Sequence, residues 1–306
     1  GRAEDDACVN PIPATFNLTN GVRVPLLGFG LAGLGDGTKG VVEHAVEAGF
    51  THFDSAQAQE WYNEAGLGQA LEGMDDSARS ALFLVTKLHP RDYLPKARAR
   101  EALQASPRNL GTEVIDLVLL HRPNCWYGSC EDAKKDPWKD AWEVLQEWYL
   151  AGKVRAIGVS NFNTAQLREL WVMGGLPGGV RPHVVQNWMD PYHQDRAVRR
   201  WCKENGVLYT AYSQFGAQWQ YMGVGVEGNV ALADPVIVEI AEKHQVHPAM
   251  VVLSWALQEG ISVIPRSSKQ ENIRANAKLF GPDDTLLVFL APEDVEKINS
   301  LDGKLR

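Results

Sequence analysis

Residues 51–71 read THFDSAQAQEWYNEAGLGQAL. This order predicts a short apolar strand that ends in the carboxylate of Asp54, then a polar loop, and then a helix that begins at Asn63. Two later stretches repeat the layout, because LFLVTK ends in Lys87 and VIDLVLLH ends in His121. Parallel α/β proteins place their chemistry at the carboxyl ends of strands. We therefore expect an acid, a base and an imidazole to converge at one end of a sheet.

Strands and helical patterns alternate along most of the chain. Apolar strands are predicted at Pro25–Phe29, Thr51–Asp54, Ala81–Lys87, Val114–His121, Val154–Val159, His183–Asn187, Val207–Tyr212 and Ile261–Pro265. Eight strand–helix units in a chain of 306 residues are typical of an α/β protein of the (β/α)8 TIM-barrel class. No change of composition marks a second domain, so residues 16–306 are predicted to form a single barrel.

The first residues follow a different pattern. Residues 1–15 are mostly polar and show no periodicity, so they predict a flexible N-terminal tail. Asn20 and Gly21 then lie between two short apolar runs, which is the strongest short-range signal for a β-hairpin. We expect this N-terminal hairpin to cap one end of the barrel.

Composition excludes several classes of function. The net charge is −8, so no basic field exists to hold nucleic acid or an anionic membrane. No apolar run approaches the ~18 residues of a transmembrane helix. Nothing indicates an obligate assembly, so we expect a monomer.

The chain begins at Gly1, and we expect a processed or trimmed form of a cytoplasmic protein. A secretory or membrane-anchored precursor stays open, because Asn17-Leu18-Thr19 is a glycosylation sequon.

The four cysteines are too few to act as the scaffold of a domain of this size. Cys125 and Cys130 enclose the loop CWYGSC, whose spacing permits a small disulfide, although free thiols are the favoured interpretation. Cys8 and Cys202 have no cysteine near them in sequence. Zinc would need further ligands close to the pair, so no metal site is predicted.

A glycine-rich stretch, GFGLAG at Gly28–Gly33, imitates the dinucleotide fingerprint of a Rossmann fold, with Asp54 following at a strand end. That fingerprint requires its last glycine to lie inside a helix. The next residues are LGDGTKG, whose glycines oppose helix formation and delay the predicted helix to Val41–Ala48. We therefore predict no Rossmann domain.

Two loops are longer than their neighbours, Arg122–Lys135 and Gln214–Ala233, and both would overhang the carboxyl ends of the strands. Their aromatic residues are either surface decoration or, as we favour, the walls of an apolar substrate pocket. The predicted pocket residues are Trp126, Tyr127, Trp219 and Tyr221, together with Trp61.

The strand-end residues predict a specific reaction if a tyrosine lies beside them. Alone, a lysine at a strand end most often forms a structural ion pair, and a buried histidine a structural hydrogen bond. An ammonium at Lys87, held by Asp54, would lower the pKa of a phenol from about 10, so that the phenol transfers a proton near neutral pH. The imidazole of His121 would orient or polarise a carbonyl oxygen.

From about Phe16 to Arg306 the chain resembles the aldo-keto reductase family. The matching motifs are FDSA with YNEAGLGQAL, LVTK, DLVLLHRP, GKVRAIGVSNF, VVQNWMDPY, AYSQFG and ISVIPRSSKQENIRANA. The resemblance implies a barrel that binds extended NADPH without a Rossmann domain and reduces a small-molecule carbonyl. It also implies that Asp54, Lys87 and His121 are three members of an Asp-Tyr-Lys-His tetrad.

The resemblance further implies a cofactor site. Ser160, Asn161 and Gln186 match residues that hold the nicotinamide carboxamide, and Tyr212 matches the aromatic residue that stacks on the nicotinamide ring. The positions that match the loop along the pyrophosphate are Ser213, Phe215 and Gly216, and those that match the adenosine and 2′-phosphate pocket are Arg266, Ser267, Asn272 and Asn276.

Two departures from the family pattern matter. The family tyrosine lies five residues after the aspartate, where this chain has Gln59, and counting back from Asn63 places Trp61 in that slot. The loop is longer here, and we choose the neighbouring Tyr62 as the catalytic tyrosine. Asn272 replaces an arginine of the family, so NADPH is the expected cofactor and NADH stays open.

The chain stops before most of the family's C-terminal substrate loop, so we expect an open pocket for a bulky carbonyl substrate. An NADPH-dependent aldehyde or ketone reductase is the leading hypothesis. Two alternatives stay open. One is a nucleotide-binding partner module with little turnover, and the other is a biosynthetic enzyme of this fold that performs non-reductive chemistry such as dehydration.

Overall fold

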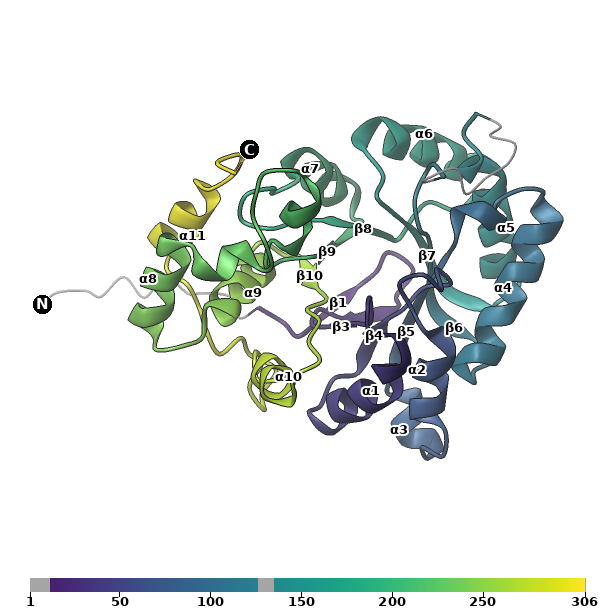
Figure 1. Ribbon diagram of the computed structural model, residues 1–306. Helices are drawn as coiled ribbons and strands as arrows, with labels where there is room; N and C mark the ends of the chain where they lie inside the picture. The colour runs from purple at the N-terminus through teal and green to yellow at the C-terminus, as the bar shows by residue number, and fades with distance from the viewer. Residues whose placement is uncertain (1–11, 126–134, 306) are drawn as a thin grey trace, which may run out of the picture.

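A closed ring of parallel strands lies at the centre of the molecule. The computed structural model describes residues 12–125 and 135–305, and helices surround the sheet (Figure 1). The sheet has the order β10-β9-β8-β7-β6-β5-β4-β3, with every pairing parallel. A parallel bridge between Leu27 and Val263 joins its two edges. The predicted (β/α)8 barrel is confirmed.

Nearly all residues of the ring strands are buried, which explains their nearly continuous apolar sequence. They are β3 Phe29–Gly30, β4 His52–Asp54, β5 Phe83–Leu88, β6 Ile115–Leu120, β7 Val154–Ser160, β8 Val184–Trp188, β9 Leu208–Tyr212 and β10 Ser262–Val263. Each predicted strand overlaps one of these, with differences of a few residues at the ends.

The outer helices are amphipathic and turn their apolar faces toward the ring. In α5, for example, Trp138 and Trp142 are fully buried. The helices are α1 Thr38–Glu47, α2 Glu64–Leu71, α3 Asp76–Ser80, α4 Lys96–Leu110, α5 Trp138–Leu150, α6 Thr164–Gly174, α7 Arg196–Asn205, α8 Pro235–His244, α9 Pro248–Gln258, α10 Gln270–Ala277 and α11 Pro292–Asn299. Within the described ranges, no helix is long and apolar enough to cross a bilayer.

The predicted N-terminal hairpin is present. Its strands are β1 Thr15–Asn17 and β2 Arg23–Pro25, which pair antiparallel and form a two-stranded sheet of their own. Pro13, inside the segment expected to be a tail, forms an antiparallel bridge with Thr285. Residues 1–11 of that segment lie outside the described part of the chain.

The glycine-rich stretch does not open a helix. Gly33 has a φ of +68°, and α1 begins five residues later, after a short 3-10 turn at Gly35–Gly37. The helix begins earlier than predicted because Gly40 is accommodated inside it. The observation agrees with the rejection of a Rossmann fingerprint.

The helix α2, which follows the loop after β4, is held in place by its cap and by a glycine contact. The side chain of Asn63 caps α2 by accepting a hydrogen bond from Gly66 N at 2.8 Å. At Gly68 an added Cβ would lie 1.9 Å from the carbonyl oxygen of Asn109. Only glycine lets α2 approach the end of α4 this closely, and α2 fixes where the preceding loop returns to the barrel.

Candidate active site

The ends of β4 and β5 bring an acid and a base into contact inside the ring. Lys87 Nζ donates to Asp54 Oδ1 at 2.5 Å and to the carbonyl oxygen of Ser55 at 2.8 Å. Both side chains of the ion pair are almost wholly buried. Burial lowers the pKa of Lys87, and the adjacent Asp54 carboxylate opposes that shift.

Gln186 connects this pair to the opposite side of the ring. Its Nε2 donates to the second carboxylate oxygen of Asp54 at 2.7 Å, from β8 to β4. Both oxygens of Asp54 are therefore occupied, and its orientation is fixed from two directions.

Tyr62 lies over the ion pair. Lys87 Nζ is 4.9 Å from the centroid of the Tyr62 ring, and the His121 ring packs edge-on against it at 5.9 Å between centroids. Trp61, by contrast, is half exposed. The structure thus brings Tyr62, and not Trp61, to the three strand-end residues.

The pKa of Tyr62 is raised, first by burial and second by the Asp54 carboxylate. The expected lowering of the phenol pKa is therefore wrong. The physical reason is that burial, the larger cause, and the Asp54 carboxylate both disfavour the phenolate. Tyr62 accordingly keeps its proton at neutral pH.

His121 directly follows β6 and is buried. Burial, followed by the nearby charge of Lys87, holds the pKa of its imidazole well below the usual value. The ring is therefore neutral at pH 7. A neutral imidazole carries one N–H, which is the group needed to orient a carbonyl oxygen.

A cluster of amide and hydroxyl groups adjoins Asp54, Tyr62, Lys87 and His121. Asn161 Nδ2 donates to the carbonyl oxygen of His121 at 2.9 Å and to Ser160 Oγ at 3.1 Å. Tyr212 OH donates to Asn161 Oδ1 at 2.6 Å. Because Ser160 and Gln186 are register partners of β7 and β8, two carboxamides and a hydroxyl lie at neighbouring strand ends. This donor and acceptor set fits a primary amide such as that of nicotinamide.

The loop after β9 begins with strained backbone. Ser213 has a φ of +56° and Gly216 a φ of +85°. An added Cβ on Gly216 would lie 2.7 Å from Val230 Cγ2, and Ala231 N donates to Phe215 O at 3.0 Å. The start and the end of this loop are therefore packed against each other.

The predicted phosphate residues lie beside the glycine-rich stretch. Arg266 is exposed, and its Nη2 donates to Gly33 O at 2.9 Å. Ser267 Oγ accepts from Lys269 N at 3.1 Å. On α10, Asn276 is buried and Asn272 is exposed. A guanidinium fixed on one side and open on the other fits recognition of a phosphate.

The predicted pocket aromatics divide into two groups. Trp219 is buried, and its indole Nε1 donates to Asp190 Oδ1 at 3.2 Å. Tyr221 and Met222, next on the same loop, are largely exposed. Trp126 and Tyr127 lie outside the described residues. Sequence reasoning missed Trp188, which ends β8 and packs edge-on against Trp219 at 5.1 Å.

The cysteines differ from the favoured interpretation. Cys125 is disulfide-bonded, whereas free thiols were preferred. Cys202 is free and buried. Cys8 and Cys130 lie outside the described residues. No group of three or more His, Cys, Asp or Glu side chains in the described ranges could hold a metal ion.

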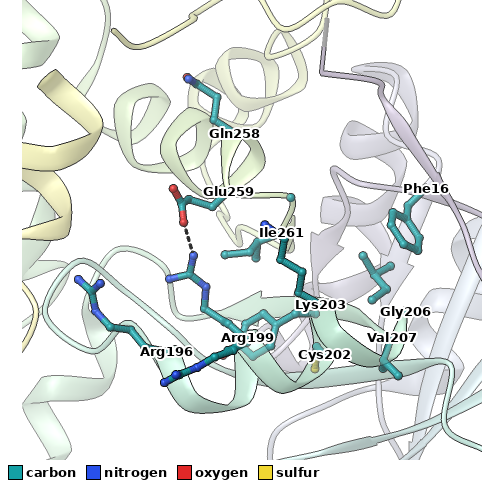
Figure 2. Close-up of a pocket in the computed structure, with 14 residues that line it drawn as sticks. Phe16, Arg196, Arg199, Cys202, Lys203, Gly206, Val207, Gln258, Glu259 and Ile261 are labelled. Carbon is teal, nitrogen blue, oxygen red and sulfur yellow. Dashed lines mark hydrogen bonds and ion pairs between the residues drawn. The ribbon is translucent and has the colours of Figure 1, made fainter. Parts of the chain in front are cut away.

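A cavity of about 680 Å³ lies at the opposite ends of the strands. Figure 2 shows Arg199 of α7 reaching Glu259, and the two form an ion pair of 2.5 Å. Gly206 and Ile261 on its wall lie just before β9 and β10. The cavity is therefore separated from Asp54, Lys87 and His121 by the length of the barrel, and we assign it no part in the chemistry.

A model of the aldo/keto reductase family matches residues 26–301. The 9,11-endoperoxide prostaglandin H2 reductase of Trypanosoma cruzi (strain CL Brener) is 36% identical, over 94% of this chain and 92% of that protein. The glyoxal reductase of Bacillus subtilis (strain 168) is 31% identical, over 94% and 92%. The crystal structure of an aldo/keto reductase from Brucella melitensis is similar with a TM-score of 0.79 and 29% identity, covering 95% of this chain and 100% of that one.

Proposed function

Because this chain belongs to the aldo/keto reductase family, whose members are oxidoreductases, we propose that it is an NADPH-dependent reductase of aldehydes and ketones. The observation that carries the proposal is the buried Asp54–Lys87 ion pair with Tyr62 above it and His121 beside it. Such an arrangement couples a proton donor, a charge that stabilises its anion, and an orienting imidazole.

NADPH, when bound, supplies a hydride to the carbonyl carbon. The carbonyl oxygen takes its proton from the hydroxyl of Tyr62. Lys87 Nζ, 4.9 Å from the phenol ring centroid, stabilises the phenolate that this transfer creates. The Asp54 carboxylate favours the charged form of Lys87 and so opposes the effect of burial. The neutral His121 donates its N–H to the carbonyl oxygen and holds it near Tyr62.

The cofactor site is proposed from the same geometry. Ser160, Asn161 and Gln186 hold the nicotinamide carboxamide, and Tyr212 stacks on the ring. Gln186 also donates to Asp54 at 2.7 Å, so the group that orients the nicotinamide touches the tetrad directly. Arg266 recognises the 2′-phosphate, which favours NADPH over NADH. Ser213, Phe215, Gly216, Ser267, Asn272 and Asn276 complete the proposed site.

The proposed substrate is a bulky carbonyl compound. Tyr221, Met222 and Trp61 are exposed apolar side chains at the carboxyl ends of the strands or on the loop after β9. The name of the T. cruzi relative, 9,11-endoperoxide prostaglandin H2 reductase, gives prostaglandin H2 as its substrate. An extended apolar aldehyde is accordingly expected to react faster than a small polar one.

The test is the oxidation of NADPH with a panel of aldehydes, compared between wild type and Tyr62→Phe. Removing the phenolic proton is expected to lower kcat by about 100-fold or more, since general acid catalysis contributes about 10²–10⁴. Tyr149→Phe, on α5 and outside the proposed site, is the matched control and is expected to keep most of the rate. Quenching of tryptophan fluorescence shows whether each variant still binds NADPH. Equal rates for wild type and Tyr62→Phe would refute the assignment, and binding without oxidation of any carbonyl would favour a nucleotide-binding module.

A further inference from the structure

The loop that carries Tyr62 has more residues between Asp54 and Asn63 than the family motif has, and hydrogen bonds hold it at both ends. At its start, Gln57 N donates to Lys87 O at 3.1 Å. The Gln57 side chain donates to Ala102 O on α4 at 2.8 Å. At its end, Trp61 O accepts from Gly33 N at 2.6 Å. The loop that precedes Tyr62 is thus held by specific hydrogen bonds.

A further hydrogen bond joins the middle of this loop to the residues that follow β5. Glu60 Oε1 lies 2.9 Å from Nε2 of His89, a side chain that is almost wholly buried. His89 Nδ1 accepts a hydrogen bond from Arg91 N at 3.0 Å. Since Nδ1 is an acceptor, the proton of the neutral ring resides on Nε2 and points at Glu60. The direction of the Glu60–His89 hydrogen bond is therefore fixed.

The position of this pair relates it to the proton donor. Glu60 precedes Tyr62 by two residues, and His89 follows Lys87 by two. The intervening backbone is a single tight turn, because Trp61 N and Tyr62 N both donate to Ala58 O, at 2.9 and 2.8 Å. Within such a turn, a movement of Glu60 is transmitted to Tyr62. The hydrogen bond thus joins the Tyr62 segment to the Lys87 segment.

We propose that Glu60 and His89 are positioning residues that hold the phenol of Tyr62 over Lys87 and so set the rate of proton transfer to the carbonyl oxygen. This inference rests on the proposed reductase function. Neither residue touches the reacting atoms. The Glu60 side chain is about one-third exposed, and a partly exposed hydrogen bond adds little to stability, so its main effect is on geometry.

The experiment compares Glu60→Ala, Glu60→Gln and Gln59→Ala. Glu60→Ala removes the acceptor, and the displaced phenol is expected to lower kcat by about 10-fold to 100-fold, as small misplacements do. The KM for NADPH should stay unchanged, and the solvent deuterium isotope effect on kcat should rise. Glu60→Gln keeps an oxygen acceptor for His89 and should stay within about twofold of wild type. Gln59→Ala, at an exposed neighbour in the same loop, is the matched control and should behave as wild type.

A second readout does not depend on turnover. Hydrogen–deuterium exchange of the peptide that covers residues 57–62 should become faster in Glu60→Ala, and not in the other two variants. Unchanged exchange in Glu60→Ala, or a kcat that falls equally in Glu60→Ala and Gln59→Ala, would overturn the inference. So would a Glu60→Gln variant as slow as Glu60→Ala. If the proposed reductase function itself is wrong, the wild type will not oxidise NADPH with any carbonyl, or Tyr62→Phe will be as fast as the wild type. These results are distinct from those that test Glu60.

Discussion

At the scale of single residues, the buried histidines make the stability of the fold sensitive to acid. Burial is the main cause that lowers the pKa values of His52, His89, His121 and His183 below 6.5 in the folded state. Below pH 6.5 the unfolded chain takes up protons that the folded chain does not. The free energy of unfolding is therefore fully present above pH 6.5 and falls as the pH is lowered from there toward the folded-state pKa values.

His121 gives this expectation a single-residue test. Its pKa is lowered well below the usual value, so it contributes up to about 1.4 kcal/mol per pH unit below pH 6.5. His121→Gln does not titrate and should lessen the pH dependence by about that amount. Urea unfolding of both proteins at a series of pH values between about 5 and 7.5 measures the difference. Parallel curves would mean that the pKa of His121 is the same in the folded and unfolded states, which contradicts its lowering by burial.

At the scale of elements, the packing of α2 on α4 decides where the Tyr62 loop ends. A methyl group at Gly68 would collide with Asn109 O, so Gly68→Ala should destabilise the fold by about 1–3 kcal/mol and displace α2. Gly40→Ala is the control, because Gly40 lies in α1 with open space where an added Cβ would stand. That change should stabilise the fold by about 0.5–1 kcal/mol, since alanine favours a helix. Urea unfolding measures both, and a neutral Gly68→Ala would mean that α2 and α4 are not in close contact.

The same elements show what the sequence could and could not predict. Asp54, Lys87 and His121 could be grouped in advance because parallel strands align their carboxyl ends. Tyr62 could be chosen over Trp61 only from its neighbours in sequence, since the path of an irregular loop has no periodic signal. The Glu60–His89 hydrogen bond depends on that path and was missed. Alternation along a strand could have suggested that His89 shares a side with Lys87.

At the scale of the whole molecule, the proposed cofactor site is assembled from distant parts of the barrel. Asn161 follows β7, Gln186 is in β8, Tyr212 ends β9 and Arg266 follows β10. Because no separate nucleotide domain exists in the described ranges, a bound cofactor must stabilise the barrel as a unit. A ligand present at about 100 times its Kd adds about 2.7 kcal/mol to the free energy of unfolding.

Ligand-induced stabilisation tests the role of Arg266. The chain has a net charge of −8, which repels an anionic cofactor where no cation offsets it. NADPH should raise the Tm of the wild type more than NADH does at equal concentration. In Arg266→Gln the two shifts should become equal, because the guanidinium that distinguishes the 2′-phosphate is gone. Arg274→Gln, at an exposed arginine on α10, is the control and should keep the wild-type difference. The preference should also weaken as salt screens the phosphate. Equal shifts already in the wild type would show that Arg266, although fixed to Gly33, does not face a bound 2′-phosphate.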